Sequence, residues 1–112
     1  MSCLFCGIIA GEIPATVVHE TERTIAFRDL NPGAPTHVLV VPRDHFADAA
    51  ELAEADPAYA GEVLAAAAAV ARQEGLTGGY RLVTNTGDDA GQTVHHLHVH
   101  VLGGRALSWP PG

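Results

Sequence analysis

The sequence predicts an α+β fold, a five-stranded antiparallel sheet with one main helix and a short N-terminal helix. Five short segments have the branched and aromatic composition of strands, and one long segment carries apolar residues at helical spacing. The connections are mostly of hairpin length, which favours antiparallel pairing. At 112 residues the chain has the length of one domain, so we expect a single unit over 1–112 with an extended tail over 103–112.

Local signals place each predicted element. The strand segments, each rich in branched or aromatic residues, are 17–20, 24–28, 37–41, 80–85 and 93–102. A short helix over 4–10 ends at Gly11, and the main helix begins after the N-cap Asp56, with Pro57 in the first position. Gly75 ends this helix, and the glycine-rich segment 86–92 is predicted to be a loop.

The charge balance and the first residues narrow the function classes. Thirteen acidic residues against six basic ones give a net charge of −7, which argues against nucleic acid as a partner because such proteins need a basic face. The first residues show no signal-peptide pattern, and no segment approaches the roughly 20 apolar residues of a membrane span. We therefore expect a cytoplasmic protein with no membrane partner, whose cysteines stay reduced.

Near the end of the chain, three histidines alternate with three aliphatic residues: His96, Leu97, His98, Val99, His100 and Val101. Because alternate residues of a strand share a face, we expect the three imidazoles on one side and the aliphatic residues in the core. The same alternation places His95 on the aliphatic side, in the core or an interface. One metal ion held by all three histidines would be strained, since the outer two lie roughly 13 Å apart along a strand. A surface stripe of histidines without a role is a second alternative.

We favour the interpretation that one of these histidines is a nucleophile toward phosphorus. A neutral imidazole is nucleophilic near pH 7, because the ordinary pKa of histidine is about 6.5. Attack on phosphorus forms a phosphorus–nitrogen bond that water can later break, and a neighbouring group can donate a proton to the phosphate or to the leaving group. His98 has a histidine on each side, so it is the predicted nucleophile.

The loop before the histidines supplies candidate phosphate ligands. Glycines such as Gly91 allow backbone N–H groups to approach an anion closely, and Gln92 and Thr93 add neutral donors. A plain flexible turn is the alternative interpretation. The glycines are not followed by the Lys-Ser/Thr pair of a P-loop, so phosphate transfer of that kind is not indicated.

Cys3 and Cys6 form a Cys-x-x-Cys pair that could be half of a zinc site, two free thiols or a redox pair. A redox pair normally begins a helix that follows a strand, and the start of this chain does not offer that context. A tetrahedral zinc ion needs two further ligands, for which His45 and His96 are candidates. In that arrangement His98 stays free for chemistry.

These residues together resemble the histidine-triad (HIT) family, and within it the histidine-triad nucleotide-binding branch. The alternating segment 96–102 is similar to the family signature, and further similar segments are 7–15, 26–29, 34–37, 79–81, 91–94, 103–105 and 109–112. The resemblance implies a HIT-like fold and a homodimer whose sheets join into ten strands. It also implies a purine nucleoside phosphoramidase, a hydrolase that releases AMP from phosphoramidates or acyl adenylates through a covalent AMP–histidine intermediate.

The resemblance also implies roles for individual residues. The four implied catalytic residues are His98 as nucleophile, His100 on the phosphate, His37 behind the nucleophile and Thr93 on the leaving-group side. The implied nucleotide-binding residues, besides His98, His100 and Thr93, are Asp29 on the ribose, Phe5, Ile8, Ile9 and Leu30 on the base, and Asn85, Gly91, Gln92 and Val94 at the phosphate. Trp109 would reach the partner's active site, unless the tail folds back on its own domain. Some bacterial members hold a structural zinc ion, for which the implied ligands are Cys3, Cys6, His45 and His96.

Three other functions stay open on the sequence. A dinucleoside polyphosphate hydrolase belongs to the same family, but those enzymes usually have a longer chain. A nucleotide-binding adaptor with weak catalysis and a zinc metallohydrolase come from different classes. The residues do not identify the leaving group, and the preference for adenine rests on the resemblance alone, since apolar packing discriminates bases weakly.

Overall fold

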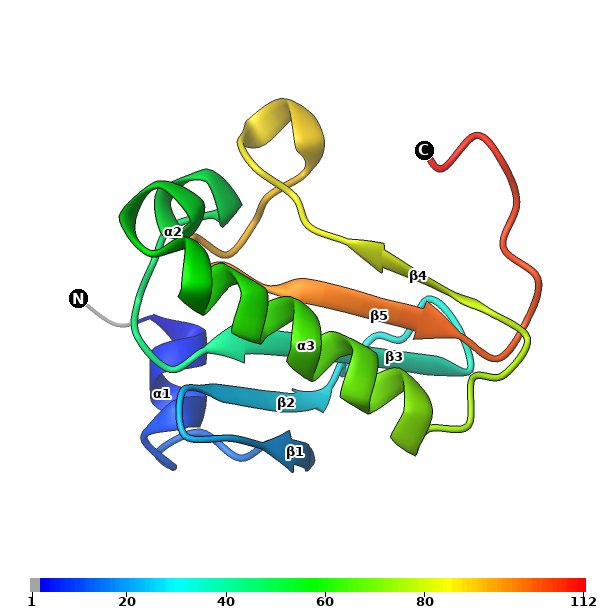
Figure 1. Ribbon diagram of the computed structural model, residues 1–112, viewed down its shortest axis with the longest axis horizontal. Helices are drawn as coiled ribbons and strands as arrows, with labels where there is room; N and C mark the ends of the chain where they lie inside the picture. The colour runs from blue at the N-terminus through cyan, green and yellow to red at the C-terminus, as the bar shows by residue number, and fades with distance from the viewer. Residues whose placement is uncertain (1–2) are drawn as a thin grey trace.

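Five strands form one antiparallel sheet in the order β1-β2-β3-β5-β4 in the computed structural model, which describes residues 3–112 (Figure 1). The strands are β1 (Val17–Glu20), β2 (Thr24–Arg28), β3 (Thr36–Pro42), β4 (Tyr80–Val83) and β5 (Val99–Gly103). The predicted α+β class, five-stranded antiparallel sheet and hairpin over 17–28 are confirmed. β4 lies at one edge of the sheet, beside β5.

Both predicted helices are present, and their ends follow the expected signals. The helices are α1 (Leu4–Ile9), α2 (Ala49–Ala55) and α3 (Pro57–Gln73), and a single 3-10 turn, η1 (Asp88–Ala90), lies within the predicted loop 86–92. The Asp56 side chain accepts a hydrogen bond from the Tyr59 N–H, as an N-cap should. Gly75 follows the end of α3 with φ +72°, which favours glycine.

Helix α2 was not predicted, although its signal is local. Asp48 accepts a hydrogen bond from the Glu51 N–H, and the Glu51 carboxylate accepts one from the Ala47 N–H. This resembles a capping box, except that the Glu51 carboxylate bonds the N–H of the residue before the N-cap and not that of the N-cap itself. The seven residues of α2 bury one large side chain, Leu52, so the helical periodicity is too short to stand out. The expectation of a single main helix was therefore incomplete.

The sheet separates two apolar clusters. On one face α3 lies across the strands (Figure 1), and residues such as Tyr59, Val63 and Val70 pack against Val38 and Val101. On the other face Phe5 of α1 packs with β2 and β3 residues in a smaller cluster: Ile25, Phe27, Leu39 and Val41. The second face is only partly covered because α1 is short, which leaves room for a cavity.

The last strand begins later than predicted. The sequence pattern indicated a strand over 93–102, but β5 begins at Val99. Before Val99 the backbone groups form hydrogen bonds with partners outside the sheet. The Leu97 N–H donates to the carbonyl of Phe46, and the carbonyl of His98 accepts from the Thr84 hydroxyl. Only His100 of the three histidines therefore lies within a strand. The alternation nevertheless persists, since Leu97, Val99 and Val101 all join the α3 cluster.

Other boundaries differ from the prediction by a few residues. Strand β4 ends at Val83 and not at 85, and β3 extends by one residue at each end. Across residues 3–112, no helix combines the length and the apolar character needed to cross a membrane.

Candidate active site

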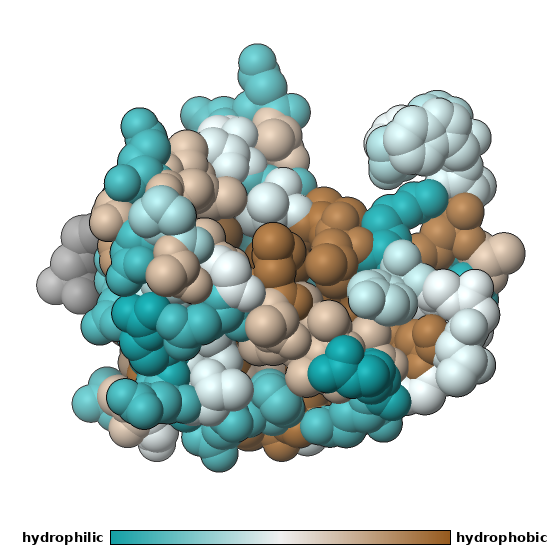
Figure 2. All heavy atoms as spheres, in the orientation of Figure 1, coloured by the Kyte–Doolittle hydropathy of each residue, from teal (hydrophilic) through white to brown (hydrophobic). Residues whose placement is uncertain are grey.

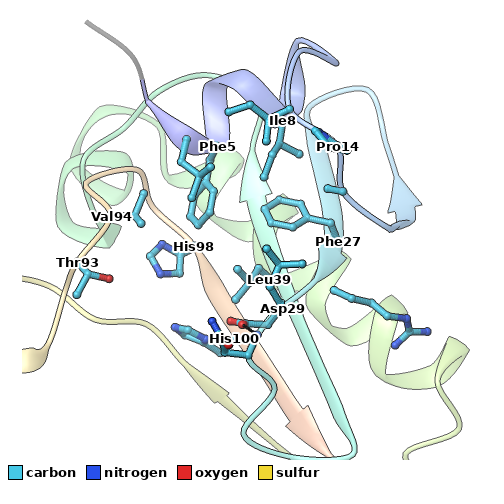
Figure 3. A pocket seen from close by; sticks show the side chains of 16 residues that line it. Phe5, Ile8, Pro14, Phe27, Asp29, Leu39, Thr93, Val94, His98 and His100 are labelled. Atoms are coloured by element: carbon cyan, nitrogen blue, oxygen red, sulfur yellow. Dashed lines mark hydrogen bonds between the residues drawn. The ribbon is translucent and has the colours of Figure 1, made fainter.

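An open cavity of about 310 Å³ lies between α1 and the sheet (Figure 3). One end is apolar, and its lining includes Phe5, Ile8, Pro14, Phe27 and Leu39. The other end is polar, and its lining includes Asp29, Thr93, His98 and His100. The volume lies within the range of small-ligand sites, and a cavity with one apolar and one polar end suits an amphipathic ligand.

The position of the His98 imidazole is set by one short hydrogen bond. His98 Nδ1 lies 2.8 Å from the carbonyl oxygen of His96, and because a carbonyl can only accept, Nδ1 carries the proton. In the neutral ring the lone pair is then on Nε2. Phe5 packs edge-on against this imidazole, with ring centroids 5.0 Å apart, and the side chain is 7% exposed. His98 is therefore a buried, oriented ring whose free nitrogen belongs to the wall of the cavity.

A chain of hydrogen bonds orders the second histidine of the cavity, His100. The Gly33 N–H donates to His37 Nδ1 at 2.9 Å, so the proton of neutral His37 is on Nε2. His37 Nε2 lies 2.8 Å from His100 Nδ1 and 3.4 Å from a carboxylate oxygen of Asp29. His100 Nδ1 thus accepts, and its Nε2–H points to the side-chain oxygen of Asn85 at 3.2 Å. This series of hydrogen bonds leaves His100 as an N–H donor beside His98, with ring centroids 5.0 Å apart.

Burial keeps His100 neutral. Loss of hydration lowers the pKa of His100 to about 4, and the nearby imidazoles of His98 and His37 lower the pKa further than burial alone. The neutral ring retains one N–H, which is what a donor to a phosphate oxygen requires.

This depressed pKa predicts how stability depends on pH. Above about pH 6.5 His100 is neutral in both the folded and the unfolded chain, so its contribution to the free energy of unfolding is complete. As pH falls from 6.5 to 4, the unfolded chain binds a proton that the folded chain does not, and stability decreases by about 2 kcal/mol on this account. Urea unfolding at pH 7 and pH 4.5 should show this loss, and His100→Asn should show a correspondingly smaller difference between the two pH values. An unchanged difference in His100→Asn would contradict the assignment.

Four sulfur and nitrogen ligands converge beside the cavity, with all ligand atoms within 4.8 Å of one another: those of Cys3, Cys6, His45 and His96. His45 Nδ1 lies 3.3 Å from Cys6 Sγ, and His96 Nδ1 lies 3.5 Å from Cys3 Sγ and 3.6 Å from Cys6 Sγ. Around a tetrahedral zinc ion with ordinary bond lengths, sulfur and nitrogen ligands lie about 3.6 Å apart. The spacing of these residues therefore fits zinc.

The surroundings of the four residues support the same assignment. His96 Nε2 lies 2.9 Å from the carbonyl oxygen of Pro42, so this nitrogen carries the proton and Nδ1 presents its lone pair to the cysteines. Burial lowers the pKa of His96, which keeps its ring in the neutral form that a metal ion requires. Burial, with the neighbouring Cys3, raises the pKa of the Cys6 thiol. A cation between them would stabilise two adjacent thiolates.

Comparison with known proteins shows the family of this chain. The HIT domain family matches residues 10–107, which is most of the chain. The chain belongs to the histidine-triad family. A crystal structure of a HIT family hydrolase from Legionella pneumophila Philadelphia 1 superposes with a TM-score of 0.95 at 48% identity, covering 99% of this chain and 100% of that one.

Two curated relatives are also similar to this histidine-triad protein over almost its whole length. The 14 kDa zinc-binding protein of Zea mays is 50% identical over 111 residues, which cover 97% of this chain and 87% of that protein. Adenylylsulfatase HINT1 of Arabidopsis thaliana is 44% identical over 111 residues, which cover 97% of this chain and 76% of that protein.

Most residues predicted from the sequence to bind the nucleotide lie at the cavity of this histidine-triad protein. Those lining it are Phe5, Ile8, Asp29, Leu30, Thr93, Val94, His98 and His100. Leu30 is 89% exposed, so it forms a rim and not a wall. Ile9 packs in the smaller apolar cluster and does not line the cavity. Asn85 and His37 do not line it either, but each hydrogen-bonds His100, which does.

The loop before the histidines is held by the side chain of Gln92. Its amide donates to the carbonyls of Ala47 and Val94, and its oxygen accepts from the Gly87 N–H. Both of its polar atoms are therefore engaged within the protein, whereas the sequence predicted that they would face a phosphate. Gly91 has φ +81° after η1, a conformation that favours glycine, and it lies outside the cavity lining.

The side chains of His95 and Trp109 are both exposed. His95 was expected in the core or an interface; it is exposed, so it does not lie in the core, because the backbone leaves the strand geometry before Val99, and an interface position stays a prediction. Trp109 is 81% exposed, and Arg81 holds the tail through the carbonyls of Leu107 and Ser108. The indole is thus not packed against its own domain.

Several residues of this histidine-triad site were not found from sequence. Phe27 and Leu39 line the cavity, but their sequence pattern indicated only ordinary inward-facing strand residues. The Gly33 N–H and the carbonyls of Pro42 and His96 orient three imidazoles, and backbone groups have no residue-type signal. The loop residues Pro32 and Gly33 indicated only a turn.

Proposed function

We propose that this protein is a nucleotidyl hydrolase that releases AMP from a nitrogen-linked or acyl-linked conjugate through a covalent AMP–histidine intermediate. The observation that carries the proposal is the His98 ring, whose Nδ1 proton is bonded to the carbonyl of His96, so that the lone pair of Nε2 is available at the cavity. The support from comparison is that the similar Arabidopsis protein is named an adenylylsulfatase, and a similar Legionella protein a hydrolase.

The cavity supports a bound orientation for the nucleotide. A purine base suits the apolar end, where Phe5, Ile8 and Phe27 offer flat and aliphatic surface. The Asp29 carboxylate is suited to accept hydrogen bonds from ribose hydroxyls, and its Oδ1 already accepts from the Asn31 N–H. The α-phosphorus then lies at the polar end beside His98 and His100.

The reaction proceeds in two balanced steps. His98 Nε2 attacks the α-phosphorus, the bond from phosphorus to the leaving group breaks, and the departing nitrogen takes up a proton. The His100 N–H, which in the free site points to the Asn85 side-chain oxygen, would turn its hydrogen bond to the negative phosphate oxygens, and the Thr93 hydroxyl at the same end would donate toward the leaving group. Water then attacks the AMP–histidine phosphorus, which releases AMP and restores the free His98. For a phosphoramidate the sum is substrate plus water giving AMP plus ammonia or an amine.

Zinc has no step in this reaction. Its four candidate ligands do not include His98, His100 or Thr93, so the metal would supply a structural cross-link between α1, the loop at 43–47 and the segment before β5. This separation favours the histidine nucleophile over a hydroxide bound to a zinc ion at that cluster, because none of its four residues lines the cavity.

Turnover of defined substrates tests the proposal. Adenosine 5′-phosphoramidate should yield AMP, and a rapid quench in alkaline denaturant should trap AMP on the protein, since a phosphorus–nitrogen bond to imidazole is labile in acid. Adenylyl sulfate and diadenosine tetraphosphate serve as parallel substrates for the other leaving groups. Binding of AMP without turnover of any of the three would contradict the proposal and favour a nucleotide-binding adaptor.

We also propose that two copies pair through β4 to form a ten-stranded sheet. β4 is an edge strand, and its Tyr80 and Leu82 are 44% and 37% exposed. Leu64 on helix α3 is 57% exposed, and Figure 2 shows apolar side chains gathered around α3 and β4. An unpaired apolar edge of this kind is a template for pairing with another copy.

Sedimentation should give twice the chain mass of 11.7 kDa, and Leu82→Lys should shift the sedimenting mass toward that of the monomer. A monomer in the unmodified protein would contradict the pairing.

A further inference from the structure

The metal cluster and the candidate nucleophile meet in a single residue, His96. Its side chain points Nδ1 at the two cysteines, and the side chain is fully buried. Its main-chain carbonyl, 2.8 Å from His98 Nδ1, is the group that decides which nitrogen of His98 carries the proton. A change in the position of the His96 ring therefore reaches the hydrogen bond of His98 through one peptide unit.

Helix α1 provides a second connection between the two sites. The Cys3 sulfur caps this helix by accepting from the Cys6 N–H, so Cys3 is its N-cap and Cys6 lies in its first turn. Between them lies Phe5, whose ring packs edge-on against both imidazoles, with centroids 5.9 Å from His96 and 5.0 Å from His98. The position of α1 thus sets the contact that confines the His98 ring.

The loop that carries His45 provides a third connection. The carbonyl of Phe46 accepts from the Leu97 N–H at 2.7 Å, directly between His96 and His98. The carbonyl of Ala47 accepts from the Gln92 amide, which holds the loop that ends at Thr93. His45 is itself exposed and reaches the cluster from outside, so a metal ion would fasten this loop to the rest.

We propose that metal binding at Cys3, Cys6, His45 and His96 orients the His98 imidazole, so that the metal site and the nucleotide site are thermodynamically linked. His96 is in this view a positioning residue, acting on His98 through its carbonyl. The link to nucleotide rests on the proposed function, whereas the link to the His98 ring does not. Linkage is reciprocal, so zinc must raise the affinity for AMP by the same factor by which AMP raises the affinity for zinc.

Nitrogen NMR of histidine-labelled protein without nucleotide tests the first link. In the zinc-loaded protein His98 should show one neutral form, protonated on Nδ1. After zinc is removed with a chelator, we expect a mixture of the two neutral forms, while His37, held by the Gly33 N–H, keeps its single form as an internal control. An identical His98 spectrum with and without zinc, or failure to bind one zinc ion per chain, would overturn the proposal.

Calorimetry with AMP, and chelator competition for zinc, test the second link. We expect zinc to tighten AMP binding by roughly five-fold or more, and AMP to tighten zinc binding by the same factor. Equal AMP affinity with and without zinc overturns the linkage. If the zinc-loaded protein binds no AMP at all, the proposed function fails instead, and the His98 spectrum still decides the link to the metal.

A variant with a matched control keeps the test valid if chelation unfolds the chain. His45→Ala removes the one exposed ligand and leaves three, so we expect a folded protein with a weakened zinc site. Zinc titrated into this variant should convert the His98 spectrum and tighten AMP binding in parallel. The matched control is His95→Asn, which alters an exposed histidine next to His96 but outside the cluster. This control should respond to zinc as the unmodified protein does.

Discussion

Replacement of His98 by Asn should reduce the turnover of adenosine 5′-phosphoramidate by at least about 10⁴-fold, the scale seen when a covalent nucleophile is removed. The Asn amide can still donate to the carbonyl of His96, as His98 Nδ1 does, but its nitrogen has no lone pair with which to attack phosphorus. The initial rate of AMP release and the amount of AMP trapped on the protein are the two measurements. Both should be lost together.

The matched control for this prediction is His95→Asn, which makes the same chemical change three residues away at an exposed site. It should retain turnover and adduct. AMP binding by His98→Asn within a few-fold of the unmodified protein would show that the cavity is intact. Turnover that survives in His98→Asn would place the chemistry on another group and contradict the covalent intermediate.

Removal of zinc should have the largest effect on stability. A metal ion that binds only the folded chain adds about 4 kcal/mol to the free energy of unfolding at 1,000 times its dissociation constant. For a domain of this size, 1 kcal/mol shifts the melting temperature by about 4 °C, so a chelator should lower it by about 15 °C. Cys6→Ser removes one ligand, and its melting temperature should be low and nearly insensitive to added zinc. Differential scanning calorimetry measures both.

The control is His19→Asn, which replaces a histidine on β1 outside the metal cluster and should keep the full response to zinc.

Zinc is expected to stabilise the fold because its four ligands are far apart in the sequence. Cys3 and His96 are 93 residues apart, so a shared ion ties the first helix to the segment before the last strand. A melting temperature that does not change on chelation would show that the four residues do not form a zinc site in solution.

Much of the fold could be predicted because its signals are local. The hairpin over 17–28 and the caps at Asp56 and Gly75 depend on residue types within one turn of the chain, and all three were placed correctly. The capping hydrogen bonds of Asp48 and Glu51 were equally local, but α2 is too short to show a periodicity. The alternation of His and aliphatic residues correctly separated the two faces around β5.

The sequence by itself determined the chemical groups that this protein possesses: an alternating histidine segment, a cysteine pair, and strands and helices of known type. Only the tertiary structure decided how those groups are used. The start of β5 depends on the Leu97 N–H finding the carbonyl of Phe46, and the proton positions on His37, His96 and His98 depend on backbone groups. The physical reason is that hydrogen bonds between distant segments form only when the packed sheet and helices bring them together, and no residue type along the chain encodes which backbone group each imidazole will meet.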